Sequence, residues 1–174
     1  AVPRGCCSKY MSSLGSRQRD DRLDPFALWR RFSQDINPFS ASECVAGHAS
    51  PLPSPPGFQL TQEEKRAYDA PFVDETYVAG ARQFPVLVPT SSVHPGAHLC
   101  RNIWSLLADC QVPMTTAFGD NDPVTGPLQG LLSSSVPGAA DQPHLIIENA
   151  GHFIQEHQPG KCVETLMGML DRTG

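Results

Sequence analysis

The sequence predicts an α/β fold, in which a parallel sheet follows a helical segment along the chain. Two short apolar segments between residues 112 and 147 are each followed by a helical pattern, which gives a strand–helix–strand–helix unit. Strands joined through a helix run parallel, because the helix returns the chain to the same end of the sheet. The composition, 40% hydrophobic and 18% charged over 174 residues, fits one domain with a core and argues against a disordered chain.

Three parts of the chain differ in pattern. Residues 1–22 are polar and show no periodicity, which predicts a poorly ordered arm. Residues 23–90 are predicted to be helical with interruptions, and residues 91–174 are predicted to hold the sheet.

The helical part carries clear start and stop signals. Its first helix runs through FALWRRF (26–32), with Asp24 as the cap and Pro25 in the first turn. Four prolines within 51–56 exclude a helix or a central strand there. The capping box TQEE (61–64) begins a second helix towards Tyr68. A third helix is predicted from Tyr77 to Phe84, where Pro85 halts it.

The last part alternates helices and strands. The apolar spacing predicts, in order, a helix over 98–109, a strand over 112–118 that ends at Gly119, a crossover helix over 128–132, a buried strand over 145–147 and a final helix over 161–170.

Asp122 and His152 follow the two predicted strands, in the loops GDNDP (119–123) and ENAGHF (148–153). Parallel neighbours end at the same edge of a sheet, with strands about 4.8 Å apart, and this edge is where open α/β folds bind ligands. A carboxylate on one imidazole nitrogen fixes the tautomer of a histidine base. The pair is therefore predicted to be the acid–base part of a hydrolytic site. Asp120 is the rival carboxylate, and a turn-forming aspartate beside an ordinary loop histidine is the alternative interpretation.

Several other functions are disfavoured. A net charge of −5 argues against nucleic-acid binding, and no apolar run is long enough for a membrane span. The six cysteines form no CxxC pair and suggest a reducing, cytoplasmic location. Pro95 and Gly96 separate His94 from His98 and break the helical face that a shared metal would need. We expect no metal.

Four segments resemble the haloalkane dehalogenases of the α/β-hydrolase superfamily over about residues 23–171. They are FALWRRFSQ (26–34), AYDAPFVDETYVAGARQFPVLVP (67–89), TAFGDNDPVTG (116–126) and IIENAGHFIQE (146–156). The resemblance implies a helical cap over 23–90 and the C-terminal portion of a hydrolase sheet over 91–174.

The resemblance also implies roles. His152 matches the catalytic base and Asp122 its acid partner, while Trp29 matches the tryptophan that binds the halide and Phe26 a neighbouring pocket aromatic. The substrates implied are a small halogenated hydrocarbon and water, halide is released, and no cofactor is needed. Core packing beneath the cap is the alternative for Trp29. Trp104 is predicted to pack on its own helix.

The family's nucleophile has no counterpart here. It is an aspartate flanked by glycines on a sharp turn upstream of the cap, and residues 1–22 hold no Gly-x-Asp-x-Gly. The N-terminal half of the core is therefore expected to be absent, and the chain to be inactive unless that half is supplied. There are two alternatives. One is an epoxide hydrolase that uses Tyr68 and Tyr77, and the other is a truncated remnant that binds a partner.

Overall fold

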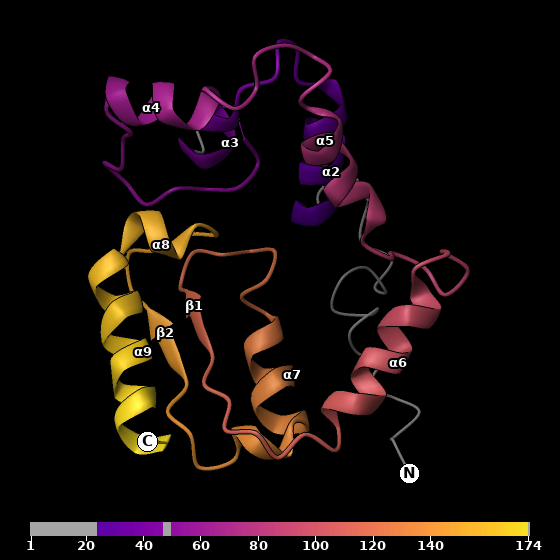
Figure 1. Ribbon diagram of the computed structural model, residues 1–174, viewed down its shortest axis with the longest axis vertical. Helices are drawn as coiled ribbons and strands as arrows, with labels where there is room; N and C mark the ends of the chain where they lie inside the picture. The colour runs from indigo at the N-terminus through magenta and orange to yellow at the C-terminus, as the bar shows by residue number, and fades with distance from the viewer. Residues whose placement is uncertain (1–23, 47–49, 174) are drawn as a thin grey trace.

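The computed structural model describes residues 24–46 and 50–173, so the predicted polar arm at 1–22 lies outside the described residues. Figure 1 shows the helices α2 to α5 at one end of the molecule and the two strands with their helices at the other. The small parallel sheet confirms the α/β class, and most of the described chain is helical.

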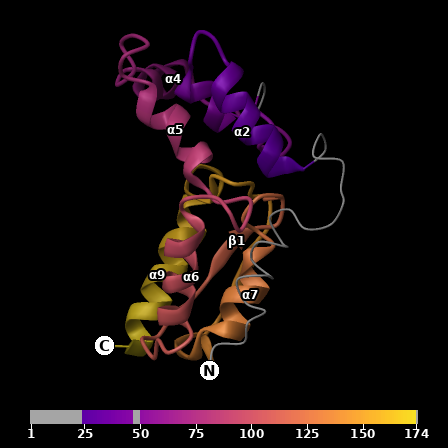
Figure 2. The same ribbon diagram turned by 90° about the vertical axis from the view of Figure 1, so that its right-hand side faces the viewer.

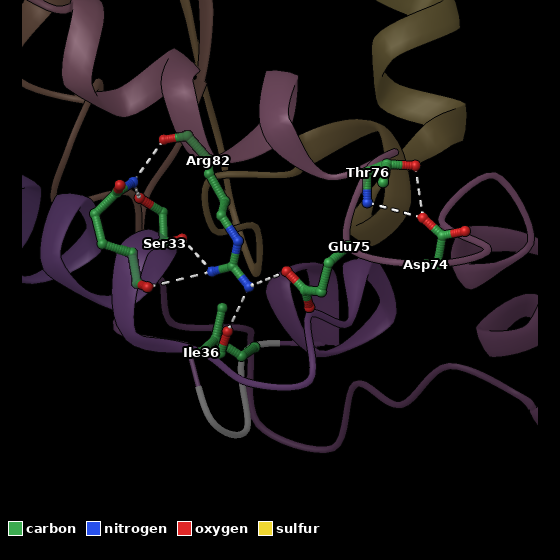
Figure 3. A network of polar contacts seen from close by, with 7 residues as sticks. Ser33, Ile36, Asp74, Glu75, Thr76 and Arg82 are labelled. Atoms are coloured by element: carbon green, nitrogen blue, oxygen red, sulfur yellow. Dashed lines mark hydrogen bonds and ion pairs between the residues drawn. The ribbon is translucent and has the colours of Figure 1, made fainter.

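Helix α2 (Pro25–Asp35) begins where the sequence predicts. The Asp24 carboxylate accepts a hydrogen bond from the Ala27 amide at 2.8 Å, and Pro25 stands in the first turn. At the other end, Arg82 of α5 (Ala79–Leu87) reaches across to carbonyl groups of the last turn of α2 and of the residue beyond it (Figure 3). These carbonyls have no partner within the helix, so Arg82 acts as its C-terminal cap.

Helix α5 (Ala79–Leu87) runs through Pro85, so the prediction that this proline halts the helix is wrong. Proline costs the turn one N–H donor, but its fixed φ is helical. The last turn is held from outside, because the Val86 carbonyl accepts from the Arg30 guanidinium at 3.4 Å and lies 3.3 Å from His94 Nε2. The helix therefore ends beyond the proline instead of before it.

The short helix α3 (Ala41–Ala46) is not predicted by the sequence, whereas α4 (Gln62–Asp69) is. The capping box of α4 is confirmed, since Thr61 and Glu64 exchange both hydrogen bonds. Asp69 at the end of α4 accepts hydrogen bonds from the Ser42 amide and hydroxyl in the first turn of α3. The two helices are thus joined by a carboxylate that lies far from α3 in the sequence. The stretch 51–56 forms neither helix nor strand, as predicted.

Strands β1 (Ala117–Gly119) and β2 (Leu145–Ile147) pair in parallel, with Phe118 opposite Ile146. The predicted strand over 112–118 is too long at its start. Pro113 has no amide hydrogen, and the Met114 and Thr116 amides donate to the Gly138 carbonyl and to the His144 ring instead of to a strand. Helix α7 (Leu128–Ser135) and a 3-10 turn (Pro137–Ala139) make the crossover.

Helix α6 (Ala97–Leu107) precedes the sheet, and α8 (Ile154–His157) and α9 (Pro159–Thr173) follow it. Figure 2 shows β1 between α9 on one side and α7 on the other, and Figure 1 shows β2 between β1 and α9. Trp104 is buried on α6, as predicted. Helix α8 has no counterpart among the predicted elements, because four residues are too few for a periodic signal.

The core lies where the helical part meets the edge of the sheet. One buried cluster holds Phe26, Leu52 and Val124, and a second holds Val45, Ala46 and Leu60. Phe153, which follows His152, packs against both clusters. Among the residues that the structure describes, no helix is long and apolar enough to cross a membrane.

Candidate active site

Asp122 lies in the loop after β1 and is held by its own turn. Its Oδ1 accepts hydrogen bonds from the amides of Val124 at 2.9 Å and Thr125 at 3.1 Å, and its Oδ2 accepts from the Thr125 hydroxyl. The side chain is 2% exposed. This local network fixes the carboxylate before any partner approaches it.

His152 lies in the loop after β2 and meets this carboxylate. Its Nδ1 is 3.1 Å from Asp122 Oδ2, and its side chain is 27% exposed. Burial disfavours the charged carboxylate, but the hydrogen bonds from His152 and Thr125 outweigh it and lower the pKa of Asp122 to about 2. An ionised carboxylate can only accept, so the neutral form of the His152 ring carries its proton on Nδ1 and keeps its lone pair on Nε2. A histidine in this state can take a proton from water.

Asp120, the rival carboxylate, makes different contacts. It is exposed, and its Oδ1 accepts from the Ala150 amide at 3.1 Å and from the Asn121 side chain at 2.7 Å. It therefore ties the end of β1 to the loop after β2. In the structure Asp122, rather than Asp120, contacts His152.

Glycines in these loops are required by close approach. A side chain on Gly151 would collide with the Pro53 carbonyl, and one on Gly119 would collide with the Ala150 carbonyl. Backbone freedom is not the reason for Gly151, because the positive φ of this loop, 55°, falls on Asn149. The stretch 51–56 thus backs directly onto the histidine loop.

An apolar cavity of about 390 Å³ adjoins the site and is formed mainly by the helical part. Trp29 and Phe153 line it, so the cavity reaches the residue next to His152. The Trp29 ring also stacks on Phe32, with centroids 5.8 Å apart. Phe26 does not line the cavity and is buried in the core cluster. The remaining lining residues are Ser33, Phe39, Ala41, Cys44, Val45, Ala67, Tyr68, Pro71, Phe72 and Ala81.

The polar groups of this cavity are already engaged or neutral. The Ser33 hydroxyl donates to the Arg30 carbonyl at 2.7 Å. Burial and a hydrogen bond to Glu156 raise the pKa of Tyr68 to about 12, and burial raises the pKa of the Cys44 thiol to about 11. The lining therefore suits an apolar ligand.

Other candidate residues lie apart from the site. Tyr77 is exposed and does not line the cavity. His94 contacts the Val86 carbonyl and the Gly96 amide, whereas His98 is exposed and contacts Asn102. Within residues 24–46 and 50–173, no three His, Cys, Asp or Glu side chains gather as metal ligands would.

Three residues that build the site are missed by the sequence reasoning. Thr125 stands three residues after Asp122, a spacing typical of turns closed by a side chain, and could have been found. Phe153 and His157 carry no such signal, because Phe153 packs against both core clusters and His157 meets Ser54, 103 residues away in the sequence.

Comparison with known proteins gives one consistent result. The chain is 37% identical to the haloalkane dehalogenase of Psychrobacter cryohalolentis over 150 residues, which are 86% of this chain and 47% of that protein. It is 37% identical to haloalkane dehalogenase 1 of Mycobacterium tuberculosis over 149 residues, 86% of this chain and 47% of that protein. The haloalkane dehalogenase of Mycolicibacterium paratuberculosis is 42% identical over 109 residues, 63% of this chain and 36% of that protein. No protein-family model matches.

The chain spans about half the length of the first two of these relatives. The similarity covers the helical part and the sheet part together, since 86% of the chain is aligned. These relatives are hydrolases by name, and the chain is similar to a part of them.

Proposed function

We propose that this chain, which is a partial haloalkane dehalogenase-like protein, supplies the acid–base pair and part of the substrate cavity of a haloalkane dehalogenase. The observation that carries the proposal is the hydrogen bond between His152 Nδ1 and Asp122 Oδ2 at the ends of two parallel strands. Relatives at 37% identity that are named for this activity support it.

The first stage is proposed to use a carboxylate nucleophile from outside these 174 residues. A carboxylate oxygen attacks the carbon that bears the halogen, the carbon–halogen bond breaks, and the halide leaves with the electron pair. An alkyl-enzyme ester results. Trp29 is proposed to donate its indole N–H to the halide as charge builds up, and its position in the lining of the cavity supports this role.

The second stage uses the residues of this chain. His152 takes a proton from water at Nε2 while the water oxygen attacks the ester carbonyl. The ester C–O bond then breaks, and the imidazolium returns the proton to the departing alkoxide, which leaves as the alcohol. Asp122 stabilises the imidazolium that forms, and its low pKa keeps it ionised throughout. Phe26 is proposed to support Trp29 from the core one turn earlier on α2, which is a smaller role than a direct contact with substrate.

The parts of the chain follow from this assignment. Residues 23–90 are proposed to be the helical cap, and residues 91–174 the C-terminal portion of an α/β-hydrolase core. The nucleophile and the other strands are proposed to come from a polypeptide that matches the remaining half of the relatives. Without it the chain should release no halide.

The test is halide release from 1,2-dibromoethane. The 174-residue protein alone should give no more bromide than its His152→Ala variant. A chimaera that joins the unmatched portion of the Psychrobacter relative to this chain should turn over. In the chimaera, His152→Gln should stop turnover while intact-mass measurement shows the alkyl ester accumulating, because only the second stage is blocked. A chimaera that turns over equally well without His152 would overturn the proposal.

An epoxide hydrolase is the second candidate, and the geometry favours it less. Such an enzyme would need tyrosine hydroxyls directed at the substrate. Tyr68 lines the cavity with its hydroxyl bound to Glu156, and Tyr77 is exposed. Styrene oxide assayed on the same chimaera beside 1-bromobutane separates the two activities.

A further inference from the structure

His157 occupies a position that the proposed reaction does not use. It ends α8, five residues after His152. Its ring lies between the histidine loop (148–153) and the proline-rich stretch (51–56). The ring forms a T-shaped pair with Phe58, with the centroids 4.4 Å apart and the two planes at 89°. The ring is half-buried and has hydrogen-bond partners on both nitrogens.

The hydrogen bonds of this ring form a continuous chain. The Gly151 amide lies 3.0 Å from His157 Nδ1, and a backbone N–H can only donate, so Nδ1 is the acceptor. The proton of the neutral ring is then on Nε2, which lies 3.3 Å from Ser54 Oγ. The Ser54 hydroxyl in turn donates to the Val45 carbonyl of α3 at 3.3 Å. The chain thus links the loop of His152 to a helix of the proposed cap.

Protonation is incompatible with this arrangement. A proton on Nδ1 would face the Gly151 N–H, so the hydrogen bond would become a contact between two donors. Burial lowers the pKa of His157 and the carboxylate of Glu156 opposes this. The partners on the other side of the ring are Ser54 of the proline-rich stretch and Phe58 just after it, and neither carries a charge. The ring is therefore neutral at pH 7 and becomes charged only in acid.

We propose that His157 is a positioning residue: its neutral ring holds the backbone of the His152 loop against the proline-rich stretch and α3, and protonation releases it. The loop is held at two adjacent amides, by Asp120 at Ala150 and by His157 at Gly151. When the bond to His157 is lost, the Gly151 amide has no partner and Asp120 holds only the neighbouring Ala150 amide. This inference rests on the proposed role of His152 as the base.

The test is hydrogen exchange of the Gly151 amide in the full 174-residue chain, relative to the intrinsic rate at each pH. In the unmodified protein, protection should be constant above neutral pH and should fall about three- to tenfold as the pH falls below 6.5, which corresponds to one hydrogen bond of ordinary strength. Protection of Gly151 that does not change with pH would overturn the proposal.

Three variants separate positioning from space filling. His157→Phe keeps a ring against Phe58 but offers no acceptor, so protection should fall at every pH. His157→Asn offers an amide oxygen that does not titrate, so protection should persist and lose its pH dependence. Ser54→Ala should leave the Gly151 bond in place and release only Nε2.

A ring that only fills space predicts equal protection in the unmodified protein and His157→Phe, and this result would also overturn the proposal. The measurement needs neither substrate nor nucleophile. It can therefore fail while the halide-release test succeeds, or succeed while that test fails.

Discussion

Asp122 uses both oxygens of its carboxylate. Oδ1 closes its own turn through two backbone amides, and Oδ2 receives the Thr125 hydroxyl and His152. Asp122 therefore makes the contacts of a turn former and also contacts the histidine. The turn fixes the carboxylate, and the fixed carboxylate fixes the ring.

The low pKa of Asp122 predicts a specific acid sensitivity. The carboxyl titrates near 3.8 in the unfolded chain and at about 2 in the folded protein. Its contribution of about 2 kcal/mol to the free energy of unfolding is therefore complete above pH 4 and is lost as the pH falls towards 2. In Asp122→Asn, urea unfolding followed by circular dichroism should show a loss between pH 4 and 2 that is smaller by this amount.

The control for this prediction is Asp109→Asn, which removes an exposed carboxylate. Its acid profile should match that of the unmodified protein. If Asp122→Asn lost as much stability in acid as the unmodified chain, its hydrogen bonds would not hold the carboxyl in its charged form.

For the residues of the site, the sequence predicts which strand ends meet. It leaves open whether Asp120 or Asp122 is the partner of His152. Both aspartates follow β1 by no more than three residues, and only the turn at Thr125 and the pairing of Asp120 with the Ala150 amide separate their directions. His157 could not be found in the sequence, since its partners Gly151 and Ser54 come from two parts of the chain that meet only in the fold.

Helix ends decide the arrangement of the helical part. Arg82 donates to the carbonyls of Ser33 at 3.0 Å and Ile36 at 2.9 Å and binds Glu75 at 3.0 Å (Figure 3). Its guanidinium also lies 5.5 Å from the centre of the Phe39 ring. The side chain is 19% exposed. One guanidinium thus holds α2, α5 and an aromatic of the cavity together.

Removal of this guanidinium should loosen the helical part. Arg82→Met keeps the length of the side chain and loses every donor, leaving carbonyls at the end of α2 without partners. We expect a loss of about 1–3 kcal/mol in the free energy of unfolding, the usual cost of hydrogen bonds to a charged group. Arg82→Lys should recover only part of it, because an ammonium cannot reproduce the planar fork.

Arg101→Met on α6 is the matched control, since Arg101 is exposed and should be replaceable within about 0.5 kcal/mol. Urea unfolding followed by circular dichroism compares the three variants. If Arg82→Met and Arg101→Met lowered the free energy of unfolding equally, the hydrogen bonds of Arg82 would not contribute to stability.

The elements predicted most accurately are those with local signals. The Asp24 cap and the capping box of α4 depend on residues within one turn of each other. The wrong boundaries depend on distant partners: α5 continues past Pro85 with help from Arg30, and β1 starts late because His144 takes the Thr116 amide. Local patterns in a sequence do not contain these partners.

At the scale of the whole molecule, the described residues expose apolar faces on two helices. On α6 the exposed set is Leu99, Ile103 and Leu106, and on α9 it is Val163, Leu166, Met167 and Leu170. Their spacing of three and four residues gives each helix one apolar stripe. Ile146 of β2 is also 54% exposed, although it lies in a strand. The chain spans about half the length of its relatives, so a polypeptide matching the other half is the proposed cover.

In isolation these faces should cover one another, and we expect the pure chain to self-associate. Burial of one such side chain contributes about 1.5–3 kcal/mol, so a few per copy are enough for association at micromolar concentration. Sedimentation velocity over a range of concentrations should show dimers or larger species.

Substitutions on α6 test whether its apolar face causes the association. Leu99→Glu combined with Leu106→Glu should shift the distribution towards monomer. Ser105→Glu adds charge at an exposed polar position of the same helix and should leave the distribution unchanged. A monodisperse monomer of the unmodified chain with a cooperative thermal transition would contradict this, because the faces would then be stable in water without a partner.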